Sequence, residues 1–195
     1  MANFSGKLNT IAQDTDSYLK SVFSKQNGKS HLIQPMKYGV FSGGKRFRSA
    51  IVVNTGKIFG IDYKKLIIIG AAVECLHSYS LMHDDLPSMD NDDLRRGRLS
   101  THKKFNEFTA ILAGNSLLTL AFEILSGSDL KVSQKIKSEL IRALSNCSGH
   151  TGLAGGQYSD LTFENKNISK KNIINMQKKK NWRIVWFLLL KYCCY

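Results

Sequence analysis

An apolar segment ends in a dense cluster of charges in the stretch Glu74-Cys-Leu-His77-Ser-Tyr-Ser-Leu-Met-His83-Asp84-Asp85-Leu-Pro87-Ser-Met-Asp90-Asn-Asp92-Asp93-Leu-Arg95-Arg96-Gly97-Arg98. Five carboxylates gather between Asp84 and Asp93, and three arginines follow them. Carboxylates at this density repel one another unless a cation lies among them. Mg²⁺ takes oxygen ligands and is commonly held by one or two carboxylates together with phosphate oxygens. Arginine side chains donate paired hydrogen bonds to phosphate groups. The stretch therefore indicates a site for a diphosphate.

The spacing of the polar residues supports this interpretation. His77 lies seven residues before Asp84, two turns away on the same face of a helix. Pro87 interrupts the helix, which allows Asp84 and Asp90 to converge although they are six residues apart. The alternative is a solvated turn of self-paired charges. The helix before the acids is apolar almost all round, which is typical of a buried helix and weighs against that alternative.

A second polar motif lies upstream, at Gly43-Gly44-Lys45-Arg46-Phe-Arg48. Two glycines let the backbone approach an anion closely, and the N-terminus of the following helix adds partial positive charge. We expect this motif to open a helix, with Lys45 and Arg48 on one face and Arg46 pointing elsewhere. Basic residues in a first helical turn are unfavourable for the helix dipole, so their presence favours an anion ligand.

Together these motifs resemble a known family. The segment from His83 to Asp90, followed by Arg95-Arg96-Gly97, is similar to the first aspartate-rich motif of the trans-polyprenyl diphosphate synthases. Four residues separate the acid pair from the last Asp, as in the bacterial farnesyl and geranylgeranyl type. The resemblance extends from about Tyr38 to Lys180. It implies an all-α, isoprenoid-synthase-type helical bundle, of which this chain holds the N-terminal part.

The resemblance also implies an activity and its residues. The family condenses isopentenyl diphosphate with an allylic diphosphate (dimethylallyl or geranyl) by Mg²⁺-assisted ionisation and attack on the carbocation. Asp84 and Asp90 would hold Mg²⁺, and Asp85 is a neighbouring carboxylate with a lesser claim. Arg95 and Lys180 would act as catalytic residues that bind the allylic diphosphate. Isopentenyl diphosphate would be bound by Lys45, Arg48, His77 and Arg96.

Further positions are interpreted through the same resemblance. An aromatic residue five positions before the acid pair goes with a C15 product in this motif type, so Tyr79 predicts farnesyl rather than geranylgeranyl diphosphate. Gln157 and Asp160 match a Gln-x-x-Asp near the cavity wall. His83 points away from the face of His77 and Asp84, and we expect it to be structural. The intact family is usually homodimeric, and its partners are small-molecule diphosphates.

Composition restricts the remaining functions. The net charge is +13, but residues 166–195 hold eight Lys and Arg and no acid. Much of the positive charge is thus concentrated in a lysine-rich end. No pattern of aromatic residues that could stack on bases accompanies it, so we expect no nucleic-acid binding. Four cysteines without metal-ligand spacing, together with an N-terminus that lacks a signal-peptide pattern, predict a cytoplasmic protein. The longest apolar run near the C-terminus, Val185–Leu190, is too short to span a bilayer.

The periodicity predicts helices throughout and no strand-like alternation, which is the all-α class. Glycines 149, 152, 155 and 156 suggest a close approach of helices or a kink. A turn is expected at residues 92–98, and the expected helices cover residues 5–25, 31–41, 45–58, 64–86, 101–125, 130–147 and 169–180.

The end of the chain departs from the resemblance. A Thr-Gly dipeptide should follow Lys180, and a second aspartate-rich motif should come later, yet neither is present. Read one base later, one possible codon spelling of Asn181–Phe187 gives Thr-Gly-Glu-Leu-Phe-Gly, which restores the pattern. We hypothesise a helical domain at residues 1–180 that is incomplete, and an out-of-frame tail at residues 181–195. Such a chain is expected to turn over weakly or not at all.

Two other functions fit parts of the sequence. A metal phosphohydrolase could use the His83-Asp84 pair, but the later histidines, His102 and His150, form no matching ligand pattern. A non-catalytic binding protein could use the lysine-rich residues 166–195.

Overall fold

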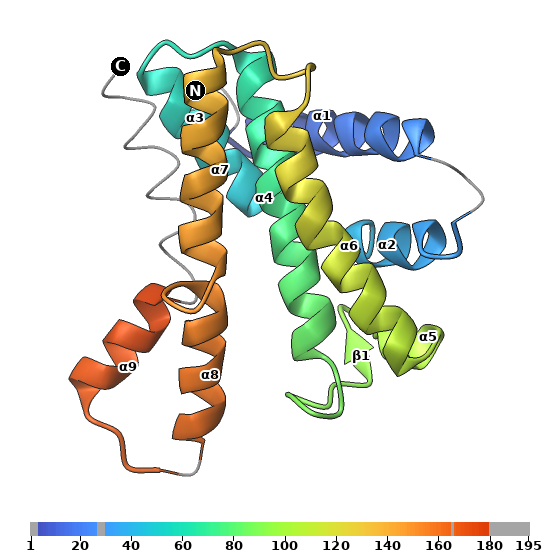
Figure 1. The fold of residues 1–195 in the computed structure, drawn as a ribbon, viewed down its shortest axis with the longest axis vertical. Coiled ribbons are helices and arrows are strands. Elements are labelled where there is room, and N and C mark those ends of the chain that lie inside the picture. The colour runs from blue at the N-terminus through green and yellow to red at the C-terminus, as the bar shows by residue number, and fades with distance from the viewer. Residues whose placement is uncertain (1–3, 27–29, 165, 180–195) are drawn as a thin grey trace. The chain divides into compact units, whose positions relative to one another are not determined.

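Helices dominate the fold, which confirms the expected all-α class (Figure 1). The computed structural model describes residues 4–26, 30–164 and 166–179. These residues fall into two compact units, one that ends at Leu130 and one that begins at Lys131. Residues 180–195, which include Lys180 and the tail expected to be out of frame, lie outside the described part of the chain.

The first unit is built around one buried helix, α4 (Tyr63–Asp84), which packs against four other helices. Every residue of α4 from Leu66 to Leu76 is buried, as its all-round apolar sequence predicts. Figure 1 shows α4 and the long helix α6 running side by side. The other elements of this unit are α1 (Phe4–Lys25), α2 (Ile33–Val40), α3 (Phe47–Ile58), β1 (Leu94–Arg95), β2 (Arg98–Leu99), α5 (Thr101–Lys104) and α6 (Glu107–Ser126).

Glycines bring α3 and α4 into close contact. A Cβ added at Gly70 of α4 would collide with the side chain of Ser49 and would lie 3.2 Å from its Cα. A Cβ added at Gly56 of α3 would collide with the side chain of Leu66. The Ser49 hydroxyl cannot move away freely, because it is hydrogen-bonded to the Thr15 hydroxyl of α1 at 2.7 Å. The spacing of these three helices is therefore fixed by small residues.

Two elements between residues 92 and 126 differ from the expectation. The expected turn at residues 92–98 is a hairpin, in which β1 and β2 pair antiparallel around Arg96 and Gly97. Both turn residues have positive φ, +55° and +76°, as a tight two-residue hairpin turn requires. The single helix expected at residues 101–125 is divided into α5 and α6. Asn106 begins a new helix there, because its side chain accepts a hydrogen bond from the Thr109 amide.

The second unit contains α7 (Gln134–Ser148), α8 (Leu153–Phe163) and α9 (Lys170–Gln177). Ser169 caps α9, because its side chain accepts a hydrogen bond from the Asn172 amide. Helix α8 was not expected, because two glycines lie in its first turn and glycine weakens helices. Gly155 of this turn and Gly152, the N-cap residue, have a steric role: a Cβ at either position would collide with a backbone carbonyl group earlier in the chain. These contacts join neighbouring backbone segments, so they differ from the expected close approach of two helices.

Two helices, α4 and α6, are long and apolar enough to cross a membrane by length and composition alone. In the most apolar 18-residue stretch of α4, 72% of the residues are buried inside the protein. Because α4 packs against α6 and three further helices, its apolar character is accounted for by the protein core.

The contact between Gly70 and Ser49 predicts that Gly70→Ala destabilises the protein. Overpacking costs up to about 3 kcal/mol, and the better helix propensity of Ala returns only about 1 kcal/mol. We expect a net loss of about 2 kcal/mol in the free energy of unfolding, measured by urea denaturation. Lys64→Ala, on the exposed first turn of α4, is the control and should change stability by less than about 0.5 kcal/mol. Equal free energies of unfolding for the two variants would show that the close approach at Gly70 does not limit the size of the side chain there.

Candidate functional site

The turn that precedes α3 is shaped by three residues with positive φ. Gly43 and Gly44 have φ values of +89° and +134°, and Arg46 adopts the left-handed conformation at +45°. Helix α3 begins at Phe47, with Arg46 as its N-cap residue. The prediction that Lys45 and Arg48 share a helical face is therefore wrong, because Lys45 lies before the helix. Lys45 is exposed, so a ligand in solution can reach its ammonium group.

Arg48 and His77, which the sequence predicts in one site, are in direct contact. The Arg48 Nη1 lies 2.9 Å from the His77 Nε2. A guanidinium group only donates hydrogen bonds, so the imidazole Nε2 is the acceptor. Burial and the nearby charges of Arg48 and Arg96 lower the pKa of His77 to about 3. His77 is therefore neutral at physiological pH and accommodates the cations beside it.

Arg96 completes this group of cations from the hairpin. A Cβ added at Gly44 would collide with the Arg96 guanidinium, so the side chain of Arg96 lies directly against the glycine turn. The charge of Arg96 also contributes to lowering the pKa values of Arg48 and His77. Three of the four residues predicted to bind isopentenyl diphosphate, Arg48, His77 and Arg96, thus lie together, and Lys45 is next to Gly44 in the chain.

The loop after α4 folds back on itself at Pro87, as its sequence predicts. The backbone amide of Asp90 donates a hydrogen bond to the carbonyl oxygen of Asp84, at 2.9 Å. A second such bond, 3.2 Å long, joins the Asp92 amide to the Asp85 carbonyl. The backbones of Asp84 and Asp90 are therefore adjacent, although an unbroken helix would turn positions six apart away from each other.

This loop fits a magnesium ion shared with a ligand. Within the described residues, no group of three or more His, Cys, Asp or Glu side chains is arranged as a metal site. Asp84 is half-buried and Asp90 is exposed. Two carboxylates on adjacent backbone segments suit Mg²⁺, which usually keeps several waters and takes its other ligands from substrate phosphates.

Arg95 is bound to two acids of the same loop. Its guanidinium donates to the Asp85 carboxylate through two nitrogens, one of them Nε at 2.9 Å, and its Nη2 also lies 3.0 Å from Asp92 Oδ2. Asp85 is only 3% exposed, and burial raises its pKa while Arg95 opposes that rise. In this structure Asp85 and Asp92 therefore bind Arg95 through its Nε and Nη2 atoms.

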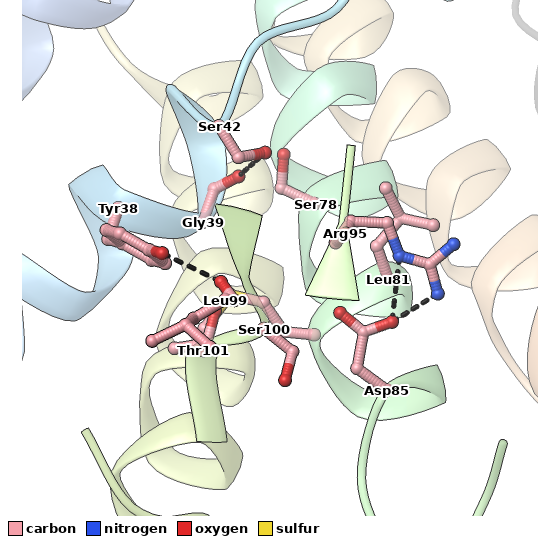
Figure 2. A pocket seen from close by; sticks show the side chains of 11 residues that line it. Tyr38, Gly39, Ser42, Ser78, Leu81, Asp85, Arg95, Leu99, Ser100 and Thr101 are labelled. Atoms are coloured by element: carbon pink, nitrogen blue, oxygen red, sulfur yellow. Dashed lines mark hydrogen bonds and ion pairs between the residues drawn. The ribbon is translucent and has the colours of Figure 1, made fainter. Parts of the chain in front are cut away.

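Figure 2 shows Arg95 and Asp85 facing each other at the edge of a small pocket between α2, α4 and the hairpin. The pocket measures about 20 Å³, enough for a single water molecule. The Tyr38 hydroxyl donates to the Leu99 carbonyl at 2.7 Å on the other side of this pocket. The Arg98 guanidinium lies over the Tyr38 ring and donates to the Phe41 carbonyl. Sequence reasoning missed this attachment of the hairpin to α2, which positions both Arg95 and Arg96.

Tyr79 and His83 lie on another face of α4. Their rings pack edge to face with centroids 4.7 Å apart, and the His83 Nε2 is 3.1 Å from the carbonyl oxygen of Ile111 in α6. His83 thus has the structural contacts expected of it. Successive helix residues rotate by about 100°, so Tyr79 points about 140° away from Asp84. The predicted role of Tyr79 in chain length stays a prediction.

Two expected site positions belong to the second unit. Gln157 and Asp160 lie one turn apart on α8. Lys180 lies outside the described residues. The assignments of these three residues stay predictions.

Comparisons with known proteins identify the family. The family model described as polyprenyl synthetase matches residues 29–185. Farnesyl diphosphate synthase of Buchnera aphidicola (subsp. Acyrthosiphon pisum) is 48% identical over 153 residues, which cover 77% of this chain and 54% of that protein. Farnesyl diphosphate synthase of Escherichia coli (strain K12) is 44% identical over 155 residues, 79% of this chain and 52% of that protein. The chain spans about half the length of these curated relatives.

Solved structures agree with the sequence matches. A geranyltransferase from Legionella pneumophila superposes with a TM-score of 0.90 at 33% identity, over 95% of this chain and 67% of that one. An FPP/GFPP synthase from Zymomonas mobilis gives a TM-score of 0.85 at 36% identity, over 95% of this chain and 69% of that one. These matches give no support to a metal phosphohydrolase. By sequence and by fold, the chain belongs to the polyprenyl synthetase family.

Proposed function

We propose that this chain carries the isopentenyl diphosphate site and the first magnesium-binding loop of a prenyltransferase that makes farnesyl diphosphate. The observation that carries the proposal is the contact of Arg48 with His77 beside Arg96, next to the folded loop that joins Asp84 to Asp90. The printed names of the relatives, farnesyl diphosphate synthase, support the same reaction class.

In this proposal, Lys45, Arg48, His77 and Arg96 bind the diphosphate of isopentenyl diphosphate. Cations gathered around a neutral imidazole repel one another, and a bound anion relieves that repulsion. The glycine turn supports the binding, because the absence of a side chain at Gly44 leaves space for the Arg96 guanidinium. Guanidinium groups also match the geometry of phosphate oxygens.

The allylic diphosphate binds near Asp84 and Asp90 in the same proposal. When bound there, Mg²⁺ supplies positive charge that stabilises the leaving diphosphate. Arg95 exchanges Asp85 and Asp92 for phosphate oxygens of the allylic substrate. Lys180 is assigned to the same diphosphate through the family resemblance.

The proposed reaction breaks the bond between C1 of the allylic substrate and its diphosphate oxygen, and the electron pair leaves with the diphosphate. The double bond of isopentenyl diphosphate supplies the electron pair of the new carbon–carbon bond. Loss of a proton then restores a double bond. Arg95 stabilises the charge that develops on the leaving group, while Arg48 and Arg96 hold the attacking substrate in place.

Three finer assignments complete the proposal. Tyr79 limits the product to fifteen carbons. The intact protein is a homodimer, as is usual in the family. Its location is the cytoplasm.

We expect Arg48→Gln to weaken the binding of isopentenyl diphosphate roughly 10- to 100-fold, because a hydrogen bond to a charged group is worth about 1.5–3 kcal/mol. Isothermal titration calorimetry of the purified chain measures this constant without any turnover. Arg142→Gln, which removes the same charge from an exposed position on α7, is the control and should bind like the original protein. Equal affinity of both variants would refute the site.

The two glycines of the turn provide a matched pair of variants. Gly44→Ala and Gly43→Ala both place a side chain at a positive φ, but only the Cβ at Gly44 meets the Arg96 guanidinium, while nothing lies within 4 Å of the one at Gly43. We expect Gly44→Ala to weaken isopentenyl diphosphate binding about tenfold more than Gly43→Ala does, by displacing Arg96. The same calorimetric titration measures both, and equal losses would show that Arg96 does not take part.

A further inference from the structure

Arg46 differs from the basic residues on either side of it, because its guanidinium is directed into the protein. It is 5% exposed, whereas Lys45 is exposed and Arg48 is half-buried. Its Nε donates to Asp16 Oδ1 of α1 at 2.7 Å, and its Nη2 donates to the Val40 carbonyl of α2 at 2.8 Å. Its hydrogen-bonding nitrogens are thus engaged with the protein interior, and a ligand above the turn would meet its neighbours instead.

Glu74 of α4 is the buried acid beside Arg46. It is 3% exposed, and its Oε2 lies 3.7 Å from the Arg46 Nη1. Its Oε1 accepts a hydrogen bond of 3.1 Å from the amide of Ser49, in the first turn of α3. Glu74 therefore attaches the start of α3 to α4, while Arg46 attaches the residue before α3 to α1 and α2.

These bonds hold a backbone conformation that a side chain disfavours. Arg46 has a φ of +45°, and a non-glycine residue in the left-handed region carries strain of about 1 kcal/mol or more. Such a conformation persists only when the surrounding contacts determine it. Because Arg46 lies between Lys45 and Arg48, its conformation sets the directions in which those two side chains leave the backbone.

Glu74 also acts on the cations at the surface of the site. It lies three residues before His77 on α4, and its negative charge favours the charged form of Arg48 against the effect of burial. A buried acid beneath the cations thus offsets part of their mutual repulsion while no anion is bound.

We propose that Arg46 and Glu74 are positioning residues that hold Lys45 and Arg48 in the geometry that receives a diphosphate, without contacting it. This inference rests on the proposed function, because that function assigns Lys45 and Arg48 to isopentenyl diphosphate. Of the three basic residues of the turn, Lys45 and Arg48 therefore bind the ligand, and Arg46 binds the protein.

The test uses the double variant Arg46→Gln/Glu74→Gln. Removing one partner alone would leave a buried charge without compensation, whereas the double change removes both charges and keeps the net charge of the protein. Long-range attraction of the ligand is therefore unchanged. We expect the dissociation constant of isopentenyl diphosphate, measured by calorimetry without metal, to rise about tenfold.

Thr15→Val is the control within the same buried layer. It removes the hydroxyl that bonds to Ser49 but leaves Arg46 and Glu74 in place. We expect it to lower the melting temperature and to leave the dissociation constant unchanged, which separates a loss of positioning from a loss of stability. A double variant that binds as tightly as the original protein would overturn the inference.

A second measurement needs no ligand. Hydrogen–deuterium exchange of the amides at residues 43–49 should be faster in the double variant than in the original protein and in Thr15→Val. Unchanged exchange there would also overturn the inference. If the original protein does not bind isopentenyl diphosphate, or if Arg48→Gln binds equally well, the proposed function fails, and the exchange measurement still decides whether Arg46 and Glu74 hold the turn.

Discussion

The contact between the Arg48 guanidinium and the His77 imidazole is the interaction on which the site depends. It joins the first turn of α3 to the middle of α4, and it exists because His77 stays neutral. A protonated imidazole there would add a further charge beside Arg48 and Arg96 and would separate them. The small residues between α3 and α4 allow the two helices to approach closely, and the Gly44 turn lets Arg96 approach from the hairpin.

Charges of opposite sign are separated at the C-terminal end of α4. The cations face the glycine turn, while Asp84 ends the helix and Asp90 lies in the loop that follows it. Arg95 belongs to the hairpin but is bound to the acids, so it links the two groups. In the function that we propose, the fixed cations bind one diphosphate and the acids bind a second one through a metal ion. This arrangement of charges explains why the loop carries more acids than a metal ion needs, since Asp85 binds an arginine.

The sequence predicted the features that depend on strong local signals. The buried helix α4 follows from an unbroken apolar run, and the fold of the acidic loop follows from Pro87. Features that depend on distant contacts were missed. The hairpin has strands of two residues, too short to show alternation, and Tyr38 attaches it to α2 from far away in the sequence. The sequence separated Arg46 from Lys45 and Arg48, but it did not show what Arg46 binds, because its acidic partners Asp16 and Glu74 lie on α1 and α4, far away in the sequence.

A calorimetric titration can compare the cations of the glycine turn with the acids at the end of α4 in one protein. Isopentenyl diphosphate and dimethylallyl diphosphate are each titrated into the original chain and into Asp84→Asn/Asp90→Asn, with and without Mg²⁺. We expect Mg²⁺ to strengthen the binding of dimethylallyl diphosphate only when both carboxylates are present, and isopentenyl diphosphate to bind equally well to both proteins. An equal gain from Mg²⁺ in the variant would contradict this expectation.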